Sequence, residues 1–345
     1  MPGARPDAHI PAASVDAAPP GPDARSGGTI PDAGAATVDG AEARPDACYP
    51  SPGLDSARLA FASAAADTLD GTNVTLLCDD VGADAEVSTL GVSCRAVSAD
   101  ERELALVRVG VNWGQITRPE VMTEAGVCTW RHPPPGAAEG MGYATTACLT
   151  TSGDDCFGVP WTIARQVVVP TALGERVGVD VEARCGPNGR LLAGGCSASV
   201  PHVDLRMIRA GVRTDGVSQT DSRWLCSYAY EGDQEIELAA VAICLEPRAE
   251  GADCCAPPSE VFVRAQRART LEATDTQVAA SCLGGRTLIT GSCSLDGEVD
   301  ALTEVRLYRS GFGSEERTAW ECGWYNDAAR APAAPVTATA TAICL

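Results

Sequence analysis

Apolar and polar residues alternate along several short segments of this chain. From Val177 to Ala183 every second residue is apolar, and from Val336 to Ala342 threonine alternates with small apolar residues. Segments 205–209 and 305–309 have the same character. Alternation with period two is typical of half-buried β-strands, and clusters of Gly, Pro, Asn and Asp between the segments indicate turns. The pattern therefore predicts an all-β protein with short antiparallel strands.

Internal repeats divide the chain after residue 47. AICL occurs at 242–245 and again at 342–345, with the looser TACL at 146–149. A Trp-x-Cys sequence recurs at Trp224 and at Trp320, and GRLLAGGC at 189–196 matches GRTLITGSC at 285–293. We expect three tandem repeats, each an antiparallel β-sandwich or barrel. Their expected ranges are 48–150 (the most degenerate), 151–247 and 248–345.

Segment 57–69 is rich in alanine and locally helix-prone. The alignment of the repeats places it opposite Val167, Val168 and Val169, which have strand character. We therefore predict a strand here.

Residues 1–47 repeat Pro-Asp-Ala and contain few bulky apolar residues. Such a segment cannot offset its ordering entropy, so we expect a disordered, semi-extended tether. No apolar signal-peptide core follows Met1, and no segment approaches the length of a membrane span. We expect export through a leader that is missing from this sequence.

The 16 cysteines are the strongest compositional signal. No C-x-x-C pair occurs, which argues against zinc ribbons and redox motifs and favours disulfides in an oxidising compartment. Each repeat has four cysteines in order. A segment rich in Pro, Asp and Gly precedes each set of four, and these segments contain Cys48, Cys156 and the pair Cys254 and Cys255, whose pairing stays open.

Two expected hairpins constrain the pairing. If Gly186–Arg190 is a tight hairpin turn, Cys185 faces residue 191, and Cys196 lies ~16 Å away at ~3.3 Å per residue. A disulfide needs Cα atoms within about 7 Å. The same reasoning applies to the turn at 231–234. We therefore predict nested pairs: Cys78–Cys148, Cys94–Cys128, Cys185–Cys244, Cys196–Cys226, Cys282–Cys344 and Cys293–Cys322.

The repeats resemble modules of secreted actinobacterial and myxobacterial proteins, whose pattern is similar to GGC, then W-x-C, then A-x-A-I-C. The second and third repeats match it over nearly their whole length. They depart from it after their first cysteine, where the pattern has a proline and this chain has Gly186 and Leu283. The first repeat matches mainly at Cys78 and its end. The resemblance implies secretion and a β module. The tail is similar to those of myxobacterial surface lipoproteins, which implies a lipid anchor in the missing leader.

The net charge of −20 makes nucleic acid and anionic lipid poor partners. The three histidines, His9, His132 and His202, do not recur between repeats, so no catalytic constellation is expected. Acidic clusters at 79–80, 154–155 and 296–300 lack calcium-loop spacing, and we expect solvated loops there. We predict no metal and no cofactor.

Aromatic residues are the remaining candidates. Trp224 and Trp320 are expected to pack on the disulfides, although a stacking platform for sugars is the alternative. Our candidate binding residues are Tyr228, Tyr230, Trp324 and Tyr325. The sequence thus favours a non-catalytic secreted or cell-surface protein for recognition, adhesion or a structural stalk, with a surface glycan or a protein as the partner considered. The alternative is a secreted hydrolase acting on glycans, with a site of acidic residues that form no motif.

Overall fold

A computed structural model describes most of the chain between Arg58 and Cys344. The predicted tether and Cys48, Cys78, Cys156, Cys254 and Cys255 lie outside the described residues. The described ranges are 58–68, 73–76, 86–98, 104–111, 126–131, 139–151, 157–158, 161–169, 176–187, 189–199, 204–212, 223–247, 263–272, 274–313, 317–328 and 335–344.

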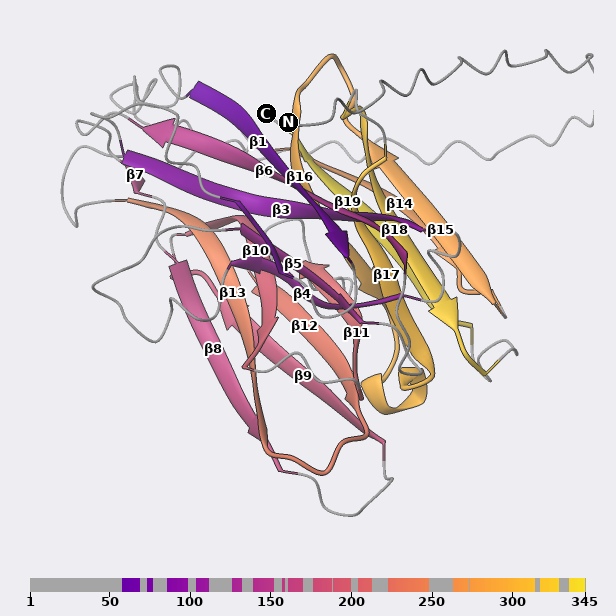
Figure 1. Ribbon diagram of the computed structural model, residues 1–345. Helices are drawn as coiled ribbons and strands as arrows, with labels where there is room; N and C mark the ends of the chain where they lie inside the picture. Colours follow the sequence, from indigo (N-terminus) through magenta and orange to yellow (C-terminus); the bar gives the residue numbers. More distant parts are fainter. Residues whose placement is uncertain are drawn as a thin grey trace, which may run out of the picture. The chain divides into compact units, whose positions relative to one another are not determined.

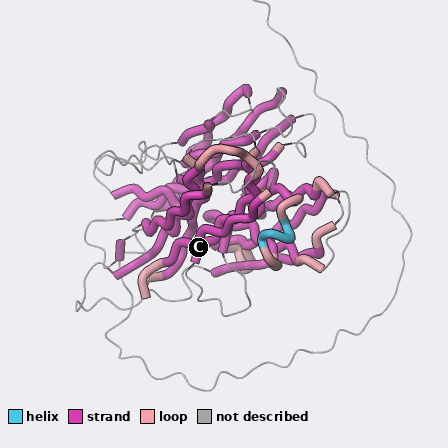
Figure 2. Tube along the Cα trace, turned by 90° about the horizontal axis from the view of Figure 1, so that it is seen from below, coloured by secondary structure: helices cyan, strands magenta, loops and turns pink. Residues whose placement is uncertain are grey.

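The all-β prediction is confirmed. Among the described residues the only helix is η5 (Val299–Leu302), a single 3-10 turn, and Figure 2 shows strands everywhere else apart from loops. The strands of the first repeat are β1 (Arg58–Thr68), β2 (Asn73–Leu76), β3 (Glu86–Ser98), β4 (Ala105–Val111), β5 (Gly126–Arg131) and β6 (Glu139–Thr151).

The later repeats have the same order of six main strands, and the second repeat has the short strand β7 in addition. The second has β7 (Phe157–Gly158), β8 (Trp161–Val168), β9 (Val177–Arg184), β10 (Arg190–Ala198), β11 (Leu205–Val212), β12 (Arg223–Tyr230) and β13 (Ile236–Pro247). The third has β14 (Val263–Thr270), β15 (Asp275–Ser281), β16 (Leu288–Leu295), β17 (Val305–Phe312), β18 (Ala319–Asn326) and β19 (Thr337–Cys344). The helix-prone segment 57–69 is strand β1, as the alignment predicts.

The three antiparallel sheets do not coincide with the three repeats (Figure 1). Sheet A has the order β1-β6-β3-β17-β18-β15, and so joins the first repeat to the third. Sheet B has the order β2-β5-β4-β10-β13, continued by β7 and β8, and joins the first repeat to the second. Sheet C has the order β14-β19-β16-β11-β12-β9, and joins the third repeat to the second.

Each repeat is therefore divided between two sheets, with three main strands in each. Three junctions connect the halves of different repeats, and their paired residues are Ser310 with Cys94, Val109 with Cys196, and Ala210 with Cys293. Since every repeat shares one sheet with each of the other two, the sheets close a ring of connections. Residues 45–345 accordingly form one compact unit.

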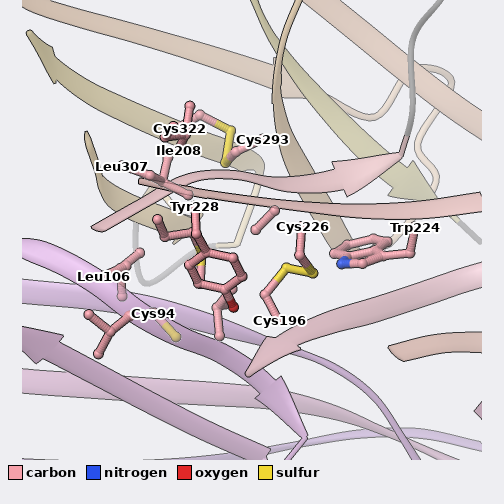
Figure 3. Packing of buried hydrophobic residues seen from close by; sticks show 14 of the residues in the cluster. Cys94, Leu106, Cys196, Ile208, Trp224, Cys226, Tyr228, Cys293, Leu307 and Cys322 are labelled. Atoms are coloured by element: carbon pink, nitrogen blue, oxygen red, sulfur yellow. A yellow bond between two sulfur atoms is a disulfide. The ribbon is translucent and has the colours of Figure 1, made fainter. Parts of the chain in front are cut away.

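The junction strands also meet at the core. Strands β4, β11 and β17 contact one another pairwise. Their Leu106, Met207 and Leu307 occupy equivalent positions and are fully buried. Figure 3 shows part of this cluster, in which the disulfides Cys196–Cys226 and Cys293–Cys322 lie among the apolar side chains. Cystines thus supply core volume in a chain with few aromatic residues.

The two hairpins expected around Cys185 and Cys226 are wrong. A tight turn does form, because the Gly189 N–H donates to the Gly186 carbonyl at 2.9 Å. Its flanking strands β9 and β10 nevertheless enter different sheets, as do β12 and β13. Alternation reveals which residues share a face, but it does not reveal which strand is the neighbour.

The disulfides cross between the two sheets of each repeat. The described pairs are Cys94–Cys128, Cys185–Cys244, Cys196–Cys226, Cys282–Cys344 and Cys293–Cys322, which belong to the nested scheme. Cys148 is also disulfide-bonded, and its expected partner Cys78 lies outside the described residues. The nested scheme therefore does not depend on the hairpins from which it was argued.

Candidate functional site

Three of the four aromatic residues considered for binding are buried. Tyr228 and Trp324 are 0% exposed and Tyr230 is 1% exposed, so they cannot stack on a ligand in this structure. The reason is their spacing: Tyr228 and Trp324 each lie two residues after a core cysteine and so share its inner face. Tyr325 points to the opposite face, is half-buried, and has the Arg306 guanidinium carbon 4.6 Å from its ring centroid.

Core packing of the recurrent tryptophans is confirmed. Trp224 is 3% and Trp320 is 1% exposed. Each indole lies against a glycine, because a Cβ at Gly194 would come within 2.2 Å of Trp224, and one at Gly291 within 2.3 Å of Trp320.

The first repeat inverts this pair of sizes. Val92 stands where the other repeats have the glycine, and Gly126 stands where they have the tryptophan. A Cβ at Gly126 would come within 2.3 Å of the Val92 side chain. The degenerate repeat therefore keeps close packing with the large and small residues exchanged.

Some buried polar atoms near the core have no hydrogen-bond partner. The Trp324 Nε1 donates to the Ile208 carbonyl at 2.9 Å. Its counterparts in the other repeats, Trp130 Nε1 and Tyr228 OH, are unpartnered. Burial raises the pKa of Tyr228, partly offset by the positive charge of Arg108, so this hydroxyl stays protonated in its buried position.

Buried arginines form a feature that the sequence reasoning missed. Arg108 is 6% exposed, its Nε and Nη2 donate to the Ala198 carbonyl at 3.0 and 2.6 Å, and Nη2 also donates to the Ser199 carbonyl at 3.2 Å. The equivalent Arg209 donates to the Gly297 carbonyl. Each arginine thus donates to a carbonyl at or just beyond the end of a strand that belongs to another repeat.

A repeated motif signals these arginines. The sequence Arg-x-Gly-apolar occurs at 108–111, 209–212 and 309–312, one copy in each repeat. The glycine is required by the close junction, because a Cβ at Gly110 would lie 2.3 Å from the Gly195 Cα. This motif survives in the first repeat, where the Trp-x-Cys signal is lost.

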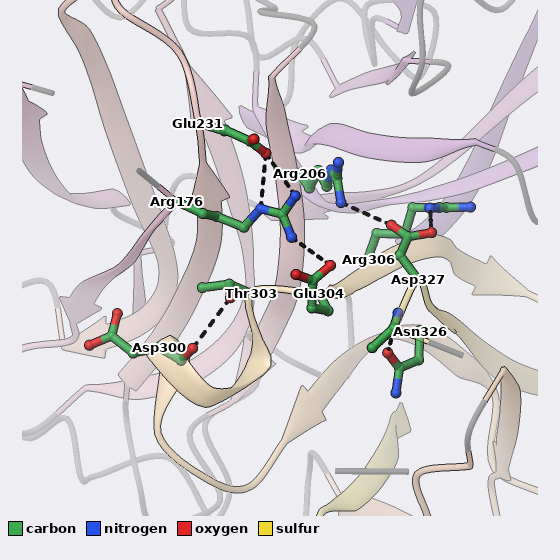
Figure 4. Close-up of polar contacts among 10 residues, drawn as sticks. Arg176, Arg206, Glu231, Asp300, Thr303, Glu304, Arg306, Asn326 and Asp327 are labelled. Atoms are coloured by element: carbon green, nitrogen blue, oxygen red, sulfur yellow. Dashed lines mark hydrogen bonds and ion pairs between the residues drawn. The ribbon is translucent and has the colours of Figure 1, made fainter. Parts of the chain in front are cut away.

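A network of acids and arginines lies between the second and third repeats (Figure 4). Arg176 binds Glu231 at 2.7 Å and Glu304 at 2.6 Å. Burial disfavours the charge of Arg176, but its hydrogen bonds to the two carboxylates outweigh that effect and raise its pKa. Arg176 and Glu231 come from the second repeat and Glu304 from the third, so the pairs hold the repeats together.

Asp327 is shared by two arginines in the same network. One of its oxygens accepts from Arg206 at 2.9 Å, and the other accepts from Arg306. Burial lowers the pKa of Arg206, and the nearby positive charge of Arg176 acts in the same direction. Asp327 offsets the repulsion between these guanidinium groups.

The acidic cluster at 296–300 serves the backbone. The Thr337 N–H donates to Asp296, and the Gly178 N–H donates to Asp300 Oδ1 at 3.2 Å. The clusters at 79–80 and 154–155 and all three histidines lie outside the described residues. Within the ranges given above, no group of three or more His, Cys, Asp and Glu residues could hold a metal ion.

Comparison of the chain with protein-family models and with curated protein sequences gave no match. The described segments also contain no helix that is long and apolar enough to cross a membrane.

Proposed function

We propose that this chain is a non-catalytic protein of the bacterial cell exterior, a rigid scaffold whose outer sheet faces serve recognition or adhesion. The observation that carries the proposal is the ring of shared sheets, braced by cystines within every repeat. Disulfides of this number are typical of oxidising compartments. Fixed sheet faces offer a preorganised binding surface, which lowers the entropic cost of recognition.

The contacts that the described charged residues make between repeats support a scaffold role. Arg176, Arg206, Arg306 and Asp327 join the second repeat to the third, and Arg108 joins the first to the second. Their positions favour mechanical integrity over proton transfer, because each carboxylate in this network already accepts from a guanidinium group. The resemblance to secreted modules, with a tail leading to a lipid anchor, fits the same role.

Binding is tested with a glycan array probed by the full-length, oxidised chain. We expect selective binding to a subset of glycans, which is lost after reduction and alkylation of the cystines. Turnover of a glycan, seen as a new reducing end, would contradict the proposal and support the alternative of a hydrolase.

Location is tested separately by brief protease treatment of intact cells that make the protein. We expect the chain to be cut within the predicted tether at residues 1–47 while a cytoplasmic marker stays whole. A chain that is cut only after cell lysis, or that contains mostly free thiols, would contradict an exterior location.

A further inference from the structure

The outer face of sheet A at the junction of β3 and β17 differs from the two corresponding junctions. Cys94 and Ser310 are paired there, and Cys94 faces the core. Continuing the antiparallel register by one residue places Arg95 beside Arg309 on the outer face. The residues that correspond to Arg95 in the other repeats are Ser197 and Ser294. Two arginines are therefore neighbours at this junction only.

Tyr143 lies on the other side of Arg95, because the two residues are paired between β3 and β6. Arg309, Arg95 and Tyr143 thus form a row across the outer face of sheet A. Tyr143 is 37% exposed. Met141 and Val97, which are paired with each other two residues further along the same face, are 39% and 49% exposed. The positions equivalent to Tyr143 are Ala239 and Thr339. Of these three equivalent positions, only that of the first repeat has an aromatic ring, and it lies beside an arginine.

The charges of the row are only partly compensated. Arg309 binds Glu321 at 2.7 Å. The Nε of Arg95 is buried and has no hydrogen-bond partner. Like charges on directly neighbouring strands repel, and an unpaired buried donor is costly. An anion bound to the accessible part of the half-buried Arg95 guanidinium group would offset the repulsion between the two arginines.

We propose that Arg95 and Tyr143 form a subsite for an acidic sugar, with Arg95 binding the carboxylate and Tyr143 stacking on the pyranose ring. A guanidinium group pairs with a carboxylate through charge-assisted hydrogen bonds, and aromatic faces pack on the apolar faces of sugars. On the far side of Arg309, the ring of Tyr308 lies over Gly323, because a Cβ at Gly323 would come within 2.5 Å of that ring. This inference rests on the proposed recognition role and names its substrate class.

The test is calorimetric titration of the full-length, oxidised chain with oligogalacturonate. The reference titrants are the fully methyl-esterified oligosaccharide, which has lost its charge, and poly-glutamate. We expect binding of the acid, at least tenfold weaker binding of the ester, and weak binding of poly-glutamate.

Two variants use residues that the other repeats already contain. Arg95→Ser should weaken the binding of oligogalacturonate at least tenfold, and Tyr143→Thr should weaken it several-fold. Arg184→Ser is the matched control, since Arg184 is exposed on sheet C and carries the same charge. It should bind as the unchanged chain does, and the melting temperatures of all three variants should show that they fold.

Each contrary result is distinct. Failure of oligogalacturonate to bind, or unchanged binding by both Arg95→Ser and Tyr143→Thr, overturns the subsite. Binding of poly-glutamate as tight as that of the sugar, and equally dependent on Arg95, would overturn the assignment to a glycan. Binding of neutral array glycans that is insensitive to Arg95→Ser overturns the subsite but leaves the recognition role intact.

Discussion

The indole rings of two tryptophans pack directly on the backbone of Gly194 and Gly291. In the first repeat the side chain of Val92 packs in the same way on Gly126. In each repeat, the size of the side chain that fits at one position of such a pair therefore depends on the size of the residue at the other position. Either large residue fits only because its partner has no side chain, as expected for an interior packed at crystal density.

The exchange can be transferred to the second repeat. Gly194→Val alone should destabilise the protein by about 3 kcal/mol through overpacking, and Trp224→Gly alone by about 4 kcal/mol through the cavity. The double variant copies the first repeat and should recover about 2 kcal/mol of their sum. Urea unfolding with the disulfides intact measures all three, and strict additivity would contradict the exchange.

Individual residues also show where sequence reasoning stopped. The burial of Trp224 and Trp320 follows from their place beside a cysteine, and their prediction as core residues holds. Tyr228 and Trp324 have the same relation to that cysteine on the same face, yet they were considered for binding. Arg95 and Tyr143 gave no signal, because exposure on an outer sheet face depends on which strands become neighbours.

At the scale of elements, single side chains fasten strands of different repeats. Arg108 extends from β4 to carbonyls at the end of β10. Its junction has one paired residue on each strand, Val109 and Cys196. The arginine therefore supplies hydrogen bonds where the ladder itself is short.

Replacement of Arg108 by Met should cost about 2 kcal/mol, the magnitude of hydrogen bonds to a charged donor. The amides of β4 and β10 should also exchange faster with deuterium than those of β8. Arg165→Met is the control, because Arg165 is exposed and its ion pair with Glu237 spans 3.9 Å; it should change stability by less than about 0.5 kcal/mol. Equal effects of the two variants would refute the role of Arg108.

The shared carboxylate makes a second element-scale prediction. Asp327→Asn removes the negative charge that Arg206 and Arg306 share and should cost about 2 kcal/mol, less than the loss of a fully buried pair because Asp327 is partly exposed. Glu304→Gln removes a single exposed contact and should cost less than about 1 kcal/mol. Urea unfolding compares the two, and a larger loss for Glu304→Gln would argue against this network.

Strand positions were predictable because alternation and turn residues are local signals. The strand β1 followed from repeat alignment even against its helix propensity. The pairing of strands was not predictable, since β9 and β10 are joined by a tight turn and still enter different sheets. The tether and the leads around the unassigned cysteines lie outside the described residues, so those predictions stay untested.

At the scale of the whole molecule, the ring of shared sheets makes the repeats depend on one another. Sheet A joins the first repeat to the third, although they are the most distant in the sequence. Such non-local pairing should make the described repeats unfold as one cooperative unit.

Cooperativity is checked by urea unfolding of the oxidised chain followed by far-UV and near-UV circular dichroism. The two signals should give a single coincident transition, because backbone pairing and aromatic packing are lost together. Separate transitions for different parts of the chain would indicate repeats that fold alone.

Hydrogen–deuterium exchange of a chain truncated after residue 247 tests the shared sheets most directly. Removal of the third repeat deprives β3 of β17 and β11 of β16. The account predicts that amides of β3 and β11 lose protection relative to the full chain, while those at the intact junction of β4 and β10 keep more of theirs. Unchanged protection throughout the first two repeats would contradict it and indicate self-contained modules.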